Sequence, residues 1–231
     1  MLRLVLALCL ASASAVAIAG CPPAGQSVDS LQRLKATTFE MPEAGRAALA
    51  MALVDCLGDP EPALRDGIAY EALAHWMRAG AFDPDELRAL RDRLLAQLDG
   101  DDPAGFRKPF AALVLSEVAR TDRVEPWMTA GERAAMVAAA AGYVESVRDY
   151  RGYDDSEGWR HGVAHGADWL MQLALNPALD RTQLDHILAA VASQAVPDAA
   201  HAYVFGEPAR LARPVGFVAA RGLHSETDWK A

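Results

Sequence analysis

Residues 83–98 read DPDELRALRDRLLAQL and carry the two signals that decide the fold. Asp83 can accept hydrogen bonds from the free backbone N–H groups of a first helical turn, and Pro84 suits that turn because it has no N–H to satisfy. Apolar side chains then recur at spacings of three and four, at Leu87, Leu90, Leu94, Leu95 and Leu98. This period places them on one face of a helix. The stretch predicts an amphipathic helix packed against neighbours.

The same start signal occurs elsewhere in the chain. Asp59-Pro60 and Asp102-Pro103 repeat it, and Thr129 with Glu132 forms a capping box before another apolar stretch. The Asp-Pro starts lie about 20 residues apart, and one helix pair per roughly 40–47 residues is the period of HEAT-like repeats. The weak run at 202–205 is the one sign of a strand. We predict an all-α fold of helical hairpins, stacked as a HEAT-like α-solenoid or a compact α-α superhelix.

The first residues resemble a bacterial secretory signal peptide. Residues 1–20 read MLRLVLALCLASASAVAIAG, with one cation, Arg3, before an apolar and small-residue stretch. The end of this stretch, Ile18-Ala19-Gly20-Cys21, resembles the lipobox of bacterial lipoproteins. That resemblance implies cleavage before Cys21 and attachment of a diacylglycerol to its sulfur. Ordinary cleavage after Ala19 and an uncleaved anchor stay open as alternatives, although the stretch is short for a membrane span of about 20 residues.

These assignments divide the chain into a signal peptide (1–20), a lipidated polar tether (21–29) and a single all-helical domain (30–231). Of the three cysteines, Cys9 leaves with the signal and Cys21 carries the lipid. Cys56 lies in an apolar helical pattern, where a lone cysteine behaves as a small buried hydrophobe. We therefore expect no disulfide in the mature chain.

The formal net charge of the chain is −9, and the sequence contains no run of Lys or Arg residues. Nucleic-acid binding depends on such cationic patches, so nucleic acid is excluded as a partner. An acidic surface also disfavours broad contact with anionic lipid headgroups, so membrane attachment should come from the acyl anchor. We expect an exported protein, lipid-anchored to a bacterial membrane and facing the periplasm or the cell exterior.

The most unusual stretch for chemistry is residues 148–176. If a helix begins near residues 156–159, then His161, His165 and Asp168 fall on one face, at i, i+4 and i+7. Such a set could act as a general base, with Asp168 orienting His165, or could hold a metal ion. A divalent metal is not favoured, because Gly162 stands where metalloproteases carry glutamate and no third ligand is identifiable. A plain structural role is the third reading.

Other polar residues could converge on the same place. They are Asp66, Glu71, Glu117, Arg120, Arg151, Trp159 and Arg160. Each could equally belong to a capping pair or a solvated helix face, so their convergence is a hypothesis for the structure to decide. The chain has no glycine-rich phosphate loop, nucleophile elbow or CxxC pair, which disfavours the enzyme classes that need them.

Several segments resemble the bacterial family catalogued as domain of unknown function 2785. They are LGDPEPALRDGIAYEAL, LSEVARTDR, RDYRGYDDSEGWRHGVAHGAD, LALNP and YVFGEPARLARPV, and the resemblance spans about residues 47–224. It implies an all-helical fold and marks His161, His165 and Asp168 as a family feature. It implies no activity and says nothing of export.

Two functions follow as hypotheses. The first is an envelope lipoprotein whose helical-repeat domain binds a protein or small-molecule partner on an extended surface. The alternative is a hydrolase that uses His161, His165 and Asp168, with or without a metal. Convergence of the polar residues around the histidines would favour the enzyme. Dispersed polar residues and histidines bonded to backbone carbonyls would favour the binding protein.

Overall fold

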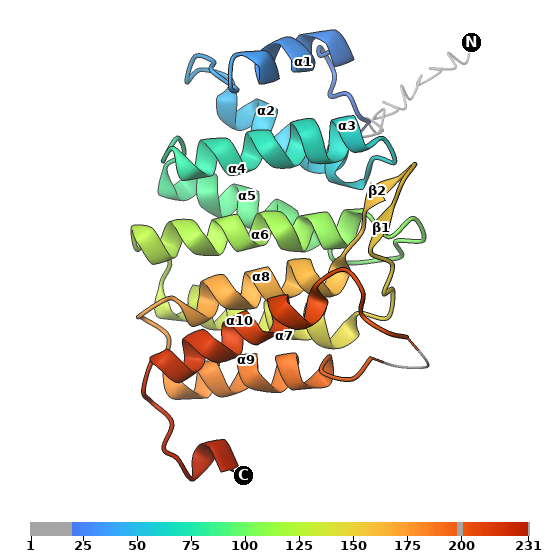
Figure 1. Ribbon diagram of the computed structural model, residues 1–231. Helices are drawn as coiled ribbons and strands as arrows, with labels where there is room; N and C mark the ends of the chain where they lie inside the picture. The colour runs from blue at the N-terminus through green and yellow to red at the C-terminus, as the bar shows by residue number, and fades with distance from the viewer. Residues whose placement is uncertain (1–19, 198–200, 231) are drawn as a thin grey trace, which may run out of the picture.

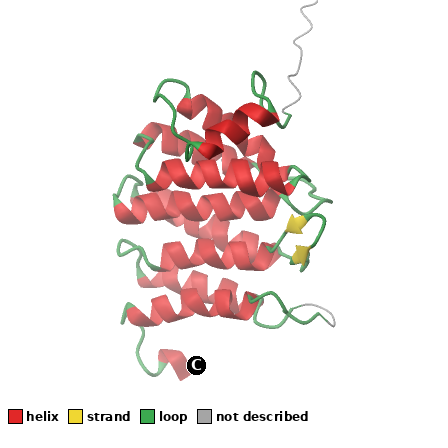
Figure 2. Ribbon diagram, turned by 45° about the horizontal axis from the view of Figure 1, so that its top comes forward, coloured by secondary structure: helices red, strands yellow, loops and turns green. Residues whose placement is uncertain are grey.

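The computed structural model describes residues 20–197 and 201–230. They form a helical protein with one small β-hairpin (Figures 1 and 2), as the predicted all-α class requires. The α-helices are α1 (Val28–Ala36), α2 (Arg46–Leu53), α3 (Pro62–Leu64), α4 (Glu71–Arg78), α5 (Pro84–Ala96), α6 (Arg107–Val124), α7 (Ala130–Ser146), α8 (Gly162–Ala174), α9 (Arg181–Ser193) and α10 (Glu207–Ala220). The remaining elements are the 3-10 turns η1 (Val54–Gly58) and η3 (Asp228–Lys230), the π-helical turn η2 (Arg65–Tyr70), and strands β1 (Tyr153–Asp154) and β2 (Gly158–Trp159).

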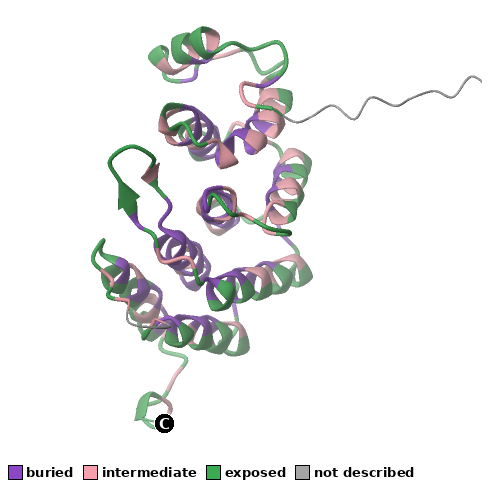
Figure 3. Cartoon of the chain, turned by 90° about the vertical axis from the view of Figure 1, so that its right-hand side faces the viewer, coloured by how far each residue is buried: buried purple, intermediate pink, exposed green. Residues whose placement is uncertain are grey.

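The helices lie in two layers. Helices α4, α6, α8 and α10 follow one another in the first layer, and α5, α7 and α9 lie in the second (Figures 1 and 3). Within the layers α6 packs on α8, α8 on α10 and α7 on α9, while α5 packs on α6 and α7 on α8 across them. Fully buried side chains such as Leu115, Trp169 and Ile187 fill the space between the layers.

Some helices begin where the sequence predicts, and others begin several residues later. Capping boxes form at Asp83 before α5 and at Thr129 before α7, as predicted. Asp102 acts differently: its Oδ2 accepts the backbone N–H of Lys108 at 2.9 Å, although α6 begins five residues later than Asp102. Asp59 also precedes its helix at a distance, because Glu61 is the N-cap of α3. An Asp-Pro pair thus marks a turn that leads into a helix, and the first helical residue can lie several positions further on.

The segment before α8 differs from the prediction. The chain forms the antiparallel hairpin β1–β2, with Tyr153 opposite Trp159, where a helix start was expected. Helix α8 begins only at Gly162, and His161 is its N-cap with left-handed backbone angles of φ 55° and ψ 38°. His161 is therefore a cap and not part of the helix itself, although its ring still meets that of His165 with centroids 5.8 Å apart. The weak strand-like run at 202–205 forms no strand.

The N-terminal segment is joined to the folded body by a disulfide between Cys21 and Cys56. This corrects the expectation of a chain without disulfides, and Cys56 is a bonded cysteine instead of a lone buried thiol. Residues 22–29, expected as a tether, include the buried Pro23 and the first turn of α1. The predicted signal peptide, apart from Gly20, lies outside the described residues. None of the described helices is both long and apolar enough to cross a membrane.

Gly166 allows α7 and α8 to approach each other closely. A Cβ at this position would lie 2.6 Å from Val144 Cγ2 and 3.0 Å from Tyr143 Cε1. Neither neighbour can withdraw, because both side chains are buried in the same core. Only a residue without a side chain fits at position 166 at this distance between the two helices.

Replacing Gly166 should destabilise the protein. We expect Gly166→Ala to lower the free energy of unfolding by about 1–3 kcal/mol through overpacking against α7. Gly142→Ala is the matched control, because a Cβ added at this position of α7 would meet nothing within 4 Å, and it should be neutral or stabilising by up to about 1 kcal/mol. Urea denaturation of the two variants compares these effects, and equal changes would contradict the packing argument.

Candidate functional site

His161 lies where the hairpin meets α8. Its ring stacks on Trp159 with centroids 4.7 Å apart, and its Nε2 lies 3.6 Å from Glu207 Oε1 of α10. Nε2 is buried and has no hydrogen-bond partner among the described residues. Burial lowers the pKa of His161, and the Glu207 carboxylate acts in the opposite direction. The gap beside the ring, bordered by Tyr150 and Tyr203, has no room for a water molecule.

His165 is a structural residue. Its Nδ1 lies 3.1 Å from the backbone oxygen of Pro109, and a carbonyl can only accept, so Nδ1 carries the hydrogen. The ring also meets Phe110 edge-on with centroids 5.2 Å apart. Burial and the neighbouring His161 lower the pKa of His165 to about 3. The imidazole is therefore neutral at physiological pH and ties α8 to the first turn of α6.

Asp168 forms ion pairs with arginines of α10 and does not bond to a histidine. Arg210 Nη1 forms a short ion pair with Asp168 Oδ2, and Arg213 Nη1 lies 3.7 Å from Asp168 Oδ1. Burial raises the pKa of Asp168, and the two arginines oppose this shift. The expected His165–Asp168 general base and the expected metal site are thus not assembled. Within residues 20–197 and 201–230 no group of three or more His, Cys, Asp or Glu side chains could hold a metal ion.

The other predicted pocket residues are dispersed over the molecule. Asp66 pairs with Arg65 at 2.7 Å, and Glu71 pairs with Lys35 at 2.9 Å, near the N-terminal end of the helix stack. The Glu71–Lys35 pair joins α4 to α1, whereas Arg65 also donates from Nη2 to the backbone oxygen of Glu157 in the hairpin at 2.8 Å. They are structural contacts and do not join the histidines.

Arg151 and Arg160 belong to the hairpin region. Arg151 pairs with Asp149, and Arg160 donates from Nε to the backbone oxygen of Ala104 at 2.7 Å. Both border an open hollow of about 480 Å³ between the hairpin and residues 201–205. Trp159 lies close by but contacts His161. Of the predicted pocket residues, Trp159 stacks on His161, and Arg151 lines the same gap and accepts the His161 backbone N–H at its carbonyl oxygen, at 3.1 Å.

Glu117 and Arg120 belong to a different surface, which runs over α4, α6, α8 and α10. Glu117 is buried and accepts two hydrogen bonds from Arg78 of α4, one of them from Nε at 2.9 Å. That bond raises the pKa of Arg78. Arg123 of α6 donates from Nε to Gln172 of α8 at 3.2 Å. We call this surface the arginine face, defined by Arg78, Arg120, Arg123, Arg210 and Arg213.

The arginine face concentrates positive charge on an acidic protein. Arg78 pairs with the buried Glu117, and Arg210 and Arg213 pair with the buried Asp168, while Arg120 and Arg123 come from α6. Glu125 lies at the edge of this face, so cations exceed carboxylates by two (five minus three). The side chains of Arg78 and Arg213 are 54% and 50% exposed. The buried carboxylates therefore hold guanidinium groups in place while leaving them accessible to a partner.

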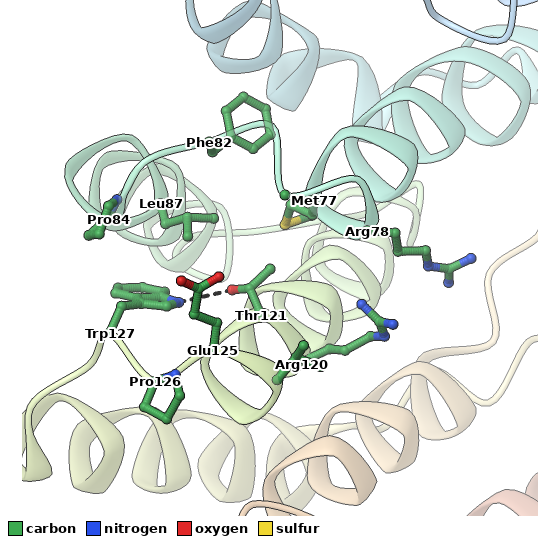
Figure 4. A pocket seen from close by; sticks show the side chains of 12 residues that line it. Met77, Arg78, Phe82, Pro84, Leu87, Arg120, Thr121, Glu125, Pro126 and Trp127 are labelled. Carbon is green, nitrogen blue, oxygen red and sulfur yellow. Dashed lines mark hydrogen bonds between the residues drawn. The ribbon is translucent and has the colours of Figure 1, made fainter.

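A small pocket opens at one end of this face (Figure 4). It has a volume of about 210 Å³ and lies where α4, α5 and α6 meet. Arg78 and Arg120 lie on one side, and the apolar groups of Phe82, Leu87 and Trp127 lie on the other. The Trp127 indole is fixed by a 3.0 Å hydrogen bond from Nε1 to Thr121 Oγ1. The pocket can take an apolar side chain, and the Glu125 carboxylate also lies in its lining, between Trp127 and Thr121.

Sequence reasoning did not identify Arg78, Arg210 or Arg213. Arg210 and Arg213 stand at i and i+3 in GEPARLARPV, so they share one helical face. That spacing was an available signal. Their partners, Glu117 and Asp168, come from other helices, and only the packed structure reveals the pairing.

Comparison with known proteins identifies a family and no activity. The family model described as "Protein of unknown function (DUF2785)" matches residues 94–231. The sequence-based resemblance had extended further toward the N-terminus, to about residue 47. No curated protein and no solved structure matches the chain.

Burial of a neutral histidine makes stability depend on pH. The pKa of His165 is lower in the folded protein than in the unfolded chain, so the unfolded chain binds more protons, and stability falls as pH drops from about 6.5 toward 3. We expect His165→Gln to reduce the slope of unfolding free energy against pH in this window by up to about 1.4 kcal/mol per pH unit.

Urea denaturation across this pH range measures the slope. His186→Gln is the matched control, because it removes an exposed histidine from α9. A slope change for His186→Gln as large as that for His165→Gln would contradict the assignment of a neutral buried His165.

Proposed function

The chain belongs to the DUF2785 family, and we propose that it is an exported helical-repeat protein of the bacterial envelope that binds an acidic polypeptide segment on its arginine face. The observation that carries this proposal is the pairing of buried carboxylates with exposed arginines. The buried Glu117 pairs with Arg78 of α4, and the buried Asp168 pairs with Arg210 and Arg213 of α10. Arginines held in this way are pre-organised, so binding requires less ordering of side chains.

The size of the surface favours a polypeptide over a small molecule. The arginines come from three helices of one layer, with α8 between α6 and α10 (Figure 1). A small anion would contact only one or two of them, whereas an extended acidic segment can contact the whole face. The 210 Å³ pocket is smaller than the 300 Å³ or more of ordinary ligand sites. It suits one apolar side chain of such a segment.

The layered helices support the helical-repeat architecture within this proposal. Each helix packs mainly on its neighbours in the two layers, from α4 to α10. Solenoid proteins are built in this way and commonly bind partners along one extended face. Export is a proposal from residues 1–20 alone.

No specific observation favours the hydrolase. His165 is bonded to a backbone carbonyl and Asp168 to arginines. His161 Nε2 has no hydrogen-bond partner among the described residues, and the gap bordered by His161, Tyr150 and Tyr203 has no room for a water molecule. A general base must be able to take up a proton, and His165 Nδ1 and Asp168 are already engaged by Pro109 and by arginines.

Binding of a labelled acidic peptide tests the proposal. The probe is a fluorescent Glu/Asp-rich peptide with a single leucine, followed by anisotropy at low and at physiological salt. We expect saturable binding that weakens with salt. Arg120→Gln with Arg213→Gln should raise Kd by about 10-fold or more, because two accessible cations are lost. Arg78 and Arg210 are left unchanged so that Glu117 and Asp168 keep their partners.

The matched control removes two positive charges elsewhere. Arg33→Gln and Lys108→Gln lie on α1 and at the start of α6, outside the arginine face, and should leave Kd nearly unchanged. Equal loss in both double variants would show that only net charge matters and would overturn the site. A single-stranded oligonucleotide is the second probe; equal or tighter binding of it would contradict an acidic polypeptide partner.

A further inference from the structure

The lipid and the disulfide require the same atom. A cysteine sulfur forms one bond besides that to its own Cβ, so Cys21 Sγ can join a diacylglycerol or Cys56, but not both. In the structure it is bonded to Cys56, with the two Cα atoms 5.1 Å apart. This separation lies within the usual range for disulfides. The sequence pattern and the structure therefore assign two incompatible roles to Cys21.

The surroundings of the two cysteines favour the cross-link. Cys56 is completely buried in η1, among core residues that include Leu53 and Leu57. Cys21 packs against the same core, and Pro23 beside it is buried. The Cys21 sulfur thus points into the protein, whereas an acyl chain on it would have to leave toward a membrane.

The segment after Cys21 is held to the folded body and is too short for such a movement. The backbone N–H of Gln26 donates to Pro23 O at 2.9 Å, and Ser27 caps α1. Leu31, one turn later, is fully buried. Only a few residues separate Cys21 from a docked helix, so membrane insertion of a lipid on Cys21 would require the segment to detach from the core.

We propose that Cys21 is a structural cysteine, cross-linked to Cys56 in the exported chain, and that it is not lipidated. The signal is then cleaved after Ala19, where Ala17-Ile18-Ala19 fits the rule for ordinary signal cleavage. The mature protein begins at Gly20 and is released from the membrane. The acidic-segment binding of the arginine face does not depend on this assignment.

The oxidation needs a partner, and a thiol–disulfide oxidoreductase of the envelope supplies it. The thiolate of one cysteine attacks the disulfide of this enzyme and forms a mixed disulfide. The thiolate of the second cysteine then displaces the enzyme. The chain loses two electrons and two protons and gains the Cys21–Cys56 bond, and the enzyme leaves as a dithiol.

Export of the full chain from a bacterial host tests the proposal. We expect the wild-type protein in the soluble periplasmic fraction, with the intact mass of a chain that begins at Gly20 and lacks two hydrogen atoms. Both cysteines should react with an alkylating agent only after reduction and unfolding. The reductant should lower the Tm of the wild type by about 5–15 °C.

The variants Cys21→Ser and Cys56→Ser separate the two roles of the sulfur. Both should stay soluble and periplasmic, should melt at the lower temperature of the reduced wild type, and should not respond to the reductant. A wild-type protein that sediments with membranes and carries a diacylglycerol mass on Cys21 would overturn the proposal. Alkylation of both wild-type cysteines without reduction would also overturn it.

Discussion

Helix α8 carries a histidine and an aspartate into the interior of a helical protein, and each buried polar group needs a partner there. Helices α6, α7 and α10 all pack against α8. The His165 imidazole meets this requirement with the Pro109 carbonyl, and Asp168 meets it with Arg210. The same burial keeps His165 neutral, since a charged imidazole would lose its hydration without gaining a counter-ion. The polar groups of α8 thus hold the helix to its neighbours.

The arginine face follows from this requirement. A buried carboxylate is stable when a cation and hydrogen bonds compensate its lost hydration. Glu117 forms an ion pair with Arg78, and Asp168 forms ion pairs with Arg210 and Arg213. These arginines lie on adjacent helices of the same layer. Each ion pair therefore has one buried end and one exposed end. The buried carboxylate charges are thus compensated, and the guanidinium groups are held in fixed positions at the surface.

The two ends of the helix stack are secured by different physical means. At the N-terminal end the Cys21–Cys56 disulfide links the segment before α1 to η1, across the chain that contains α1 and α2. Further along the stack, packing, hydrogen bonds and ion pairs secure the helices, and Gly166 permits a close approach of α7 and α8. The small side chains of α7 and α8 allow this approach, while the N-terminal helices are shorter and bury fewer side chains. A covalent link is most useful where the core contributes least.

The sequence alone determined the helical class and several helix boundaries, because caps and apolar periodicity act over a few neighbouring residues. Asp83 and Thr129 cap the helices that they were predicted to cap. It also singled out the segment around His161, His165 and Asp168, although it could not assign their partners. Pro109 lies 56 residues from His165 and Arg210 lies 42 residues from Asp168. Only the tertiary structure decided these pairings, and with them the dispersal of the expected site, because contacts between distant segments depend on how whole helices pack.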